Sequence, residues 1–555
     1  MRALATSALV ACALRSATLI GVAVLVASGP ARAQAAGPAT VETGEGVVRA
    51  LPAGALNGVA VLDADGGTLR AGPRLVEVAP DGAVSFPGAD DVFDPRTAVD
   101  ARAYAIDARG PTVVVGLGFS DVTADADQPP ATAAGFAVSA DGGRTYTYRF
   151  APLDQSRDST VTYGVSTLRA FPATVPQGAA PLDVALTAGA DTVYSANLLA
   201  GLRRSTDGGA TWTPVVTPPD SLVVLDPREP YDFVYTPDLR QPLGFVDGDR
   251  TRPVFPRAAT NFVAYSVLVD EAGTVWAGML GGLNRSVRLA GAADPAWVRY
   301  VDGPLGRSIP GDLVYALEAQ PRPGRDPVWA ACWVPDDADD GGQEFGVAVW
   351  RGDDAEGFPV FETVLLGVRV YDLAFDQARA YATSDDGLYV SDDDGTTWRT
   401  VRTFRAADGR PLPLDGPATR AVATTPGAVW VGTPGGLLKS TDGARTWELF
   451  RASVAPAADE RPVEVYAYPN PYNPRRDGRL RVRLDLAAPA DVRVRIFDVA
   501  MNLVRTLEAP GRPAGANEVA WDGQNDGGLR VANGAYVYTV DAGGQRLSGR
   551  ILVVQ

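Results

Sequence analysis

The chain has 555 residues, of which 46 % are hydrophobic and 21 % charged, a composition typical of folded globular proteins. This length exceeds one ordinary compact core, so it predicts several domains or a repeat architecture. The formal net charge of −16 argues against nucleic acid or an anionic membrane surface as the main partner, because both require a positive field.

The sequence contains no histidine. This excludes Ser-His-Asp and Cys-His catalysis, imidazole general bases and histidine metal ligands. Of the two cysteines, Cys12 lies in the N-terminal leader and Cys332 in the apolar run VWAACWV. We therefore expect one buried thiol and no intramolecular disulfide in the mature chain.

Residues 1–33 read as a secretory signal peptide. Arg2 and Arg15 are followed by the apolar stretch 18–29, and Ala31-Arg32-Ala33 gives a small-residue cleavage site. The alternative is lipidation at Cys12, because Leu9 to Cys12 resemble a lipobox. Residues 34–44 form a small-residue linker. No later apolar run approaches the ~20 residues of a membrane span, so we expect an exported protein that is not an integral membrane protein.

From residue 45 to 452 the chain repeats a unit of about four short strands. Four loops in it follow the pattern S-x-D-x-G-x-T-W, except that Tyr146 replaces the tryptophan in one loop and Ala444 replaces the glycine in another. In each loop we expect the aspartate to accept backbone N–H bonds, glycine to adopt a positive φ, and the aromatic residue to pack against a neighbour. The motif residues are Ser139, Asp141, Gly143, Thr145 and Tyr146; Ser205, Asp207, Gly209, Thr211 and Trp212; Ser391, Asp393, Gly395, Thr397 and Trp398; and Ser440, Asp442, Thr446 and Trp447, with Ala444 in place of the glycine.

These loops resemble the Asp-box, or BNR, repeats of sialidase-like and photosystem-assembly-type β-propellers. Units such as 191–212, 273–287, 378–398 and 427–447 recur every ~35–50 residues, a period typical of propeller blades. Counting less regular units, including one at 45–98, gives about seven blades. The fold class predicted is all-β, a propeller of about seven blades whose repeats must stack around an axis.

Three stretches interrupt the repeat: 153–181, 217–260 and the acidic run 336–340. Loops on one rim of a propeller often carry binding specificity. In the second stretch Tyr231, Phe233 and Tyr235 occupy every second position. They could form a ligand-stacking rim or pack the insertion against the blades, and packing is the interpretation we favour.

Residues 453–465 have the composition of a linker, and 466–555 predict a second domain. Strands with alternating polarity there indicate a small antiparallel sandwich. Four short motifs distinguish this region: 468–474, Phe497-Asp498, Trp521-Asp522-Gly523 and 533–536. In these motifs it resembles the immunoglobulin-like (Ig-like) domain of the flagellar hook-capping family and is similar to C-terminal sorting domains of type IX secretion cargo.

The sequence indicates no catalytic residue and no cofactor. The four motif aspartates should lie on separate blades, so we expect them to be structural. The sialidase resemblance implies three substrate-binding arginines, a Tyr/Glu nucleophile pair and an Arg-Ile-Pro-type motif near the first blade. The chain has no such motif there, and Phe255-Pro256-Arg257 has the wrong order and place. Without histidine, calcium is the only serious metal candidate, with oxygens from 336–340 or 522–527.

We therefore expect an exported, non-catalytic protein whose propeller binds an extracellular protein or glycan and whose C-terminal domain serves in sorting, anchoring or spacing, with secretion machinery as a further partner. The alternative is a carbohydrate-active enzyme with paired carboxylates at the propeller mouth. A third hypothesis, an assembly factor for a membrane complex, rests on the photosystem-type resemblance alone.

Overall fold

The computed structural model describes residues 39–43, 46–51, 59, 61–72, 75–80, 84–85, 101–120, 131–236, 244–245, 253–254, 260–303, 307–335, 342–377, 379–412, 414, 416–454, 465–474 and 477–555. The predicted signal peptide and the run 336–340 lie outside these ranges. Within them the one helical element is a short 3-10 turn, η2 (Thr260–Phe262). In the same ranges there is no helix long and apolar enough to cross a membrane.

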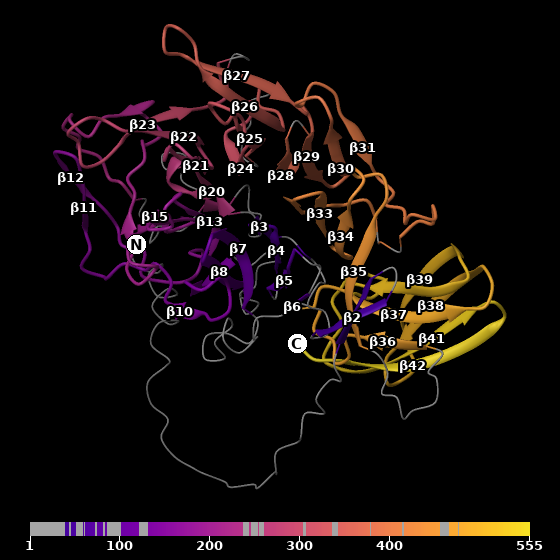
Figure 1. Cartoon of the computed structure of the whole chain (residues 1–555). Helices are drawn as coiled ribbons and strands as arrows, with labels where there is room; N and C mark the ends of the chain where they lie inside the picture. The colour runs from indigo at the N-terminus through magenta and orange to yellow at the C-terminus, as the bar shows by residue number, and fades with distance from the viewer. Residues whose placement is uncertain are drawn as a thin grey trace, which may run out of the picture. The chain divides into compact units, whose positions relative to one another are not determined.

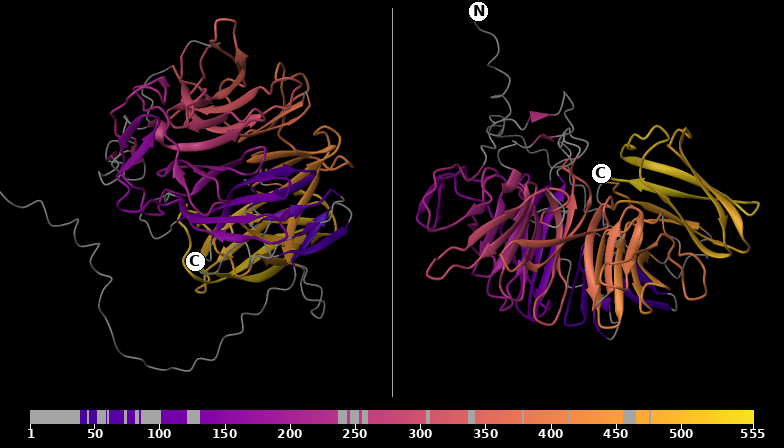
Figure 2. Two further views of the ribbon diagram at one scale, coloured as in Figure 1. Left: turned by 60° about the vertical axis from the view of Figure 1, so that its left-hand side comes forward. Right: turned by 90° about the horizontal axis from the view of Figure 1, so that it is seen from above.

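The described strands before residue 455 form seven antiparallel sheets of four or more strands and two separate two-stranded sheets. The first strands of the seven larger sheets follow one another around a ring. In order these are β3, β7, β13, β20, β24, β28 and β32. Each lies beside the next, and β32 lies beside β3, which closes the ring (Figure 1; Figure 2). The prediction of an all-β propeller of about seven blades is thereby confirmed.

Each blade is a meander that runs outward from its first strand. The first four blades consist of β3 (Leu62–Asp65), β4 (Thr68–Ala71), β5 (Val76–Val78) and β6 (Val84–Ser85); β7 (Arg102–Arg109), β8 (Thr112–Ser120), β9 (Ala131–Ser139) and β10 (Thr147–Arg149); β13 (Pro181–Leu186), β14 (Val193–Asn197), β15 (Gly201–Ser205) and β16 (Thr213–Pro214); and β20 (Ala264–Val269), β21 (Val275–Met279), β22 (Gly282–Val287) and β23 (Ala296–Tyr300).

The last three blades repeat the same order. They consist of β24 (Leu313–Ala319), β25 (Val328–Trp333), β26 (Gly346–Asp353) and β27 (Pro359–Val364); β28 (Val370–Asp376), β29 (Arg379–Ser384), β30 (Gly387–Ser391) and β31 (Arg399–Val401); and β32 (Ala421–Thr425), β33 (Ala428–Thr433), β34 (Gly436–Ser440) and β35 (Glu448–Val454).

Two strands that precede the first blade in the sequence join the last one. β1 (Ala39–Thr43) pairs with β35 on one side and with β2 (Gly46–Leu51) on the other. The N-terminal end of the described chain is therefore hydrogen-bonded to the seventh blade, and this pairing holds the ring closed where its two ends meet.

The second strands carry the most continuous apolar sequence because neighbouring blades cover both of their faces. Every residue of β21 and β25 is buried, and Trp276 and Trp329 are fully enclosed. The first strands alternate between buried and partly buried residues, which leaves one set of side chains directed toward the axis.

Because successive strands are antiparallel, their connections alternate between two faces of the ring. The four motif loops join third to fourth strands, so they share one face, here called the motif face. The opposite face, called the mouth face, carries the connections between blades. The insertion 153–181 belongs to it and contains the hairpin of β11 (Thr160–Tyr163) and β12 (Ser166–Arg169).

The second insertion lies on the same face and adds a strand to the fourth blade. In it β17 (Val224–Leu225) pairs with β23, and Val234 bridges to Arg169 of the first insertion. Two further short strands, β18 (Gly244–Phe245) and β19 (Pro253–Val254), pair with each other. The two insertions thus support one another along the outer edge of a blade.

The C-terminal domain has two antiparallel sheets, confirming the predicted sandwich. One has the order β36-β37-β40 and the other β39-β38-β41-β42, and Trp521, Tyr472 and Tyr538 are buried in the core between them. The strands are β36 (Val465–Tyr468), β37 (Leu480–Leu486), β38 (Ala490–Phe497), β39 (Leu503–Arg512), β40 (Gly515–Trp521), β41 (Gly534–Ala542) and β42 (Gln545–Val553).

Candidate functional site

The four motif loops have one hydrogen-bond pattern. The serine hydroxyl donates to aspartate Oδ1 at 2.8 Å and accepts a backbone N–H four residues later. The threonine N–H donates to Oδ1 and its hydroxyl donates to Oδ2. The fifth residue has a positive φ in every copy: Gly143 90°, Gly209 80°, Gly395 86° and Ala444 64°.

These bonds favour the ionised form of each motif aspartate. Hydrogen bonds from the threonine and serine lower the pKa of Asp141 and Asp207 to about 2 and also lower that of Asp393. Burial opposes the effect at Asp442, yet the bonds from Thr446 and Ser440 hold its pKa far below the ordinary value. Each carboxylate is occupied within its own turn, on a separate blade.

The aromatic residue of each motif contacts the blade before it. Trp212 stacks on Phe136 of β9 with ring centroids 4.7 Å apart. The other three contacts are Trp398 with Trp329 of β25, Trp447 with Phe404 after β31, and the Tyr146 hydroxyl donating to Glu77 of β5. The motif loops therefore link successive blades on the face away from the mouth.

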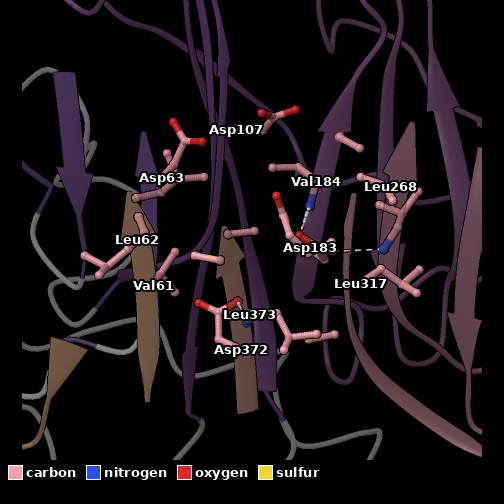
Figure 3. Close-up of a pocket in the computed structure, with 18 of the residues that line it drawn as sticks. Val61, Leu62, Asp63, Asp107, Asp183, Val184, Leu268, Leu317, Asp372 and Leu373 are labelled. Carbon is pink, nitrogen blue, oxygen red and sulfur yellow. Dashed lines mark hydrogen bonds between the residues drawn. The ribbon is translucent and has the colours of Figure 1, made fainter. Parts of the chain in front are cut away.

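The axis of the ring contains a cavity of about 930 Å³ lined by residues of all seven first strands. Among the described residues, six carboxyl groups of these strands line it: Asp63, Asp65, Asp107, Asp183, Glu318 and Asp372. Figure 3 shows four of them, Asp63, Asp107, Asp183 and Asp372, together with the aliphatic side chains that line the same space. This cavity was not predicted from the sequence.

Four of these carboxyl groups join neighbouring blades. Asp65 Oδ2 accepts the N–H of Gly110 in the next blade, at 2.8 Å. Asp107 Oδ2 accepts the N–H of Leu186 in the next blade, at 2.5 Å. Asp183 Oδ2 accepts that of Val267 at 2.9 Å. Asp372 Oδ2 accepts that of Val422 at 2.8 Å. A carboxyl group on one first strand thus satisfies a backbone donor in the next blade, which stabilises the ring.

Burial raises the pKa of five of the channel carboxyl groups. It raises the pKa of Asp183 to about 8, of Asp372 to about 7 and of Asp107 to about 6, although backbone hydrogen bonds oppose it in each case. The pKa of Glu318 is raised by burial and by four of the other carboxyl groups. Near neutral pH the channel therefore holds protonated as well as ionised carboxyl groups.

At the mouth face the channel opens onto a group of aromatic and arginine side chains, here called the mouth cluster: Tyr265, Tyr315, Trp333, Tyr371, Arg369 and Arg420. The tyrosines lie near the starts of first strands, and Trp333 ends a second strand, so all reach the same face. Tyr315 stacks on Trp333 at 3.9 Å, and Tyr371 lies edge-on to both rings.

Hydrogen bonds and ion pairs fix the cluster in place. Trp333 Nε1 donates to the Val370 carbonyl at 2.6 Å. Arg420 lies 4.3 Å above the Tyr371 ring and pairs with Asp385 at 2.8 Å. The Tyr371 hydroxyl also donates to Asp385. These contacts fix the orientations of the Trp333 and Tyr371 rings.

The predicted rim residues lie in a different place. Tyr235 is 7 % exposed, donates its hydroxyl to the Val215 carbonyl, and meets Phe262 edge to face. Tyr231 and Phe233 are partly buried in the same apolar cluster. These contacts favour the packing interpretation of the alternating aromatics, and a role in ligand binding stays a prediction.

Of the two calcium candidates, only 522–527 is described. There Asp522 Oδ1 accepts the N–H of Gln524, and Asn525 Oδ1 accepts those of Gly527 and Leu529, so these oxygens are used within the turn. In the described ranges no three acidic or cysteine side chains are grouped as metal ligands. Cys332 is buried, and burial raises the pKa of its thiol to about 12, which makes it unreactive.

Sequence reasoning missed the channel and the mouth cluster because it aligned the repeats on their second and third strands. Aligning the first strands would have provided a signal: Tyr104, Tyr265, Tyr315 and Tyr371 recur near their starts, and acidic residues follow in several of them. That pattern marks the side chains directed toward the axis.

Comparisons with solved structures find propellers at low identity. PorZ from Porphyromonas gingivalis, described as an essential bacterial surface component of the type-IX secretion system, is 15 % identical, with a TM-score of 0.25 over 89 % of this chain and 70 % of that one. YCF48 from Cyanidioschyzon merolae is 16 % identical, with a TM-score of 0.39 over 72 % and 98 %. YCF48 bound to a D1 peptide is 14 % identical, with a TM-score of 0.38 over 73 % and 95 %.

No curated protein matches this chain in sequence. One family model matches part of it: residues 473–545 fit the model described as the FlgD Ig-like domain. The predicted C-terminal Ig-like domain is confirmed over residues 473–545, and this part of the chain is similar to the FlgD Ig-like domain.

Proposed function

We propose that this chain is an exported, non-catalytic binding protein. Its propeller binds a protein or glycan at the mouth cluster, and its C-terminal Ig-like domain, at 466–555, sorts, anchors or spaces it. The four motif loops act as Asp-box repeats that hold the blades together. Export follows from the signal peptide at 1–33, which is removed before the linker at 34–44.

The mouth cluster is the observation that carries this proposal. Aromatic rings of fixed orientation combined with a few charged groups at the opening of a cavity are typical of ligand sites. The cluster lies on the face that also carries the two supported insertions. On the opposite face, the motif carboxylates are used in turns, so they offer a ligand little chemistry.

Binding can be tested with glycan and peptide arrays probed with the exported full chain. We expect signals that are lost in the Tyr265→Ala and Tyr371→Ala variants and kept in Arg144→Gln. Arg144 is a matched control because it is exposed on the motif face. Binding that is unaffected by both tyrosine variants would refute a site at the mouth.

The role of the C-terminal domain needs a separate experiment. We expect a chain truncated after residue 464 to keep array binding, because the propeller has its own cores, but to lose its normal destination in the producing cell. Cell fractionation measures that location. An unchanged distribution of the truncated chain would contradict sorting and anchoring and leave a spacer.

A second candidate is a carbohydrate-active enzyme. The observation that favours it is the raised pKa of Asp183 and Asp372, since a carboxyl group protonated near neutral pH can act as a general acid. Both groups, however, accept backbone hydrogen bonds that join blades. Release of reducing sugar from an array ligand, abolished by Asp372→Asn in a folded variant, would establish the enzyme instead.

A further inference from the structure

Arg369 occupies a distinctive position in the mouth cluster. Its guanidinium carbon lies 4.0 Å from the centroid of the Trp333 ring, with Phe345 and Tyr371 at 5.7 and 5.9 Å. Tyr315 stacks on the same indole at 3.9 Å. Two flat groups this close to one ring must cover its opposite faces, so the three side chains form a stack with Arg369 outermost.

The donors of Arg369 have no partner in the part of the chain that the structure describes. It makes no hydrogen bond or ion pair there, and its side chain is exposed. Arg420, by contrast, is paired with Asp385. Asp385 also attracts Arg369, so the two arginines share one carboxylate, which balances only one of their two positive charges. Stacking holds the plane of Arg369 fixed while the N–H groups at its edge stay free for an anion.

The surroundings limit the charge of that anion. The chain carries a net charge of −16, and Asp372 and Glu318 line the channel below the cluster. A polyanion or a dianionic phosphate would be repelled by this field more strongly than a single carboxylate. The planar guanidinium fork also matches a carboxylate with two parallel hydrogen bonds.

The remainder of the site suits a sugar. Four partly exposed tyrosines, Tyr104, Tyr265, Tyr315 and Tyr371, line the cavity and present ring surfaces and hydroxyl groups together. Pyranose rings offer apolar faces and hydroxyl groups in a comparable mixture. The volume of about 930 Å³ falls in the range of small-ligand sites, which accommodates a short oligosaccharide end.

We propose that the mouth cluster binds a carboxylate-bearing oligosaccharide, with Arg369 holding the carboxylate through its free N–H edge. This inference rests on the proposed function and names the ligand class of that site. A charged bidentate contact at a partly exposed site corresponds to a loss of about 10- to 100-fold in affinity when the guanidinium is removed.

The test uses calorimetric titration of the full chain with three probes: tetragalacturonate methyl-esterified at three of its four units, the fully esterified tetrasaccharide, and a tetraalanine peptide with a blocked N-terminus and a free C-terminal carboxylate. We expect the acid, which is the tetrasaccharide with one free carboxylate, to bind at least about 10-fold more tightly than the full ester. Arg369→Gln should remove this difference while leaving the affinity for the ester unchanged. Arg369→Lys should keep only part of it, because lysine retains the charge without the fork. Arg144→Gln should behave as wild type.

Equal binding of the acid and its ester, preference for the peptide, or discrimination that survives Arg369→Gln would each overturn the inference. So would failure of all three probes to bind. The proposed function fails separately, when no array ligand depends on Tyr265 and Tyr371. Thermal unfolding of the Arg369 variants checks that they fold, which we expect because this side chain is exposed.

Discussion

The raised pKa of Asp183 predicts a pH dependence of the unfolding free energy that a single substitution can test. The carboxyl group accepts the N–H groups of Val184 and Val267, yet burial raises its pKa to about 8, above the ordinary value of 3.8. The native state therefore holds a proton that the unfolded chain releases between about pH 4 and pH 8. Stability from this group is greatest at low pH and is lost as pH rises through 8.

The size of the effect follows from proton linkage. Each pH unit over which only the native state keeps the proton lowers the unfolding free energy by about 1.36 kcal/mol, which gives at most ~4 kcal/mol between pH 5 and pH 8. Because Asp183 faces the cavity and is only partly buried, we expect about 2 kcal/mol. Asp183→Asn cannot titrate, and because its amide has a single acceptor oxygen it loses one of the two backbone hydrogen bonds at every pH, which costs about 1 kcal/mol.

Urea unfolding followed by tryptophan fluorescence at pH 5, 6.5 and 8.5 measures these energies. Because it has lost a hydrogen bond, Asp183→Asn should be less stable than wild type at pH 5. The unfolding free energy of wild type should then fall more steeply toward pH 8.5 than that of the variant, so the difference between them shrinks or reverses at pH 8.5. Asp232→Asn changes an exposed carboxylate of the second insertion and should parallel wild type. Parallel curves for Asp183→Asn would refute the reasoning.

Three further predictions concern other parts of the molecule. Gly209→Ala should lower the unfolding free energy by about 1 kcal/mol, because its φ of 80° is strained for alanine although the new methyl group has room. Gly395→Ala should lower it by about 3 kcal/mol, because the new Cβ would lie 2.6 Å from Trp329. Equal losses of the two variants in urea unfolding would contradict this. Because the Cys332 thiol is buried and its pKa is raised, it should not react with iodoacetamide at pH 8 in the native chain but should react in urea. Mass spectrometry measures the labelling, and rapid labelling of the native chain would show that the thiol is accessible. The lowered pKa of Asp207 gives stability that is present above pH 4 and lost as pH falls toward 2, so Asp207→Asn should be less acid-sensitive than wild type over that range in urea titrations.

The sequence alone was sufficient for the features whose interactions are local. Ser205, Asp207 and Thr211 bond to one another within one short loop, so their spacing encodes the turn wherever it occurs. The recurrence of such units, each unable to bury its own faces, indicated a ring, and alternating polarity after residue 465 indicated a sandwich.

The channel and the mouth cluster depend on the tertiary structure. Asp183 meets Val267, and Trp333 meets Tyr371, only because blades distant in sequence are placed side by side with their first strands turned toward one axis. No local pattern states which face of a strand points inward or which blades are neighbours. For the same reason the sequence left the role of Tyr231 and Phe233 open, since their partners in the apolar cluster come from other segments of the chain. Local hydrogen bonding is encoded by spacing, whereas a site at the axis exists only once the ring has closed.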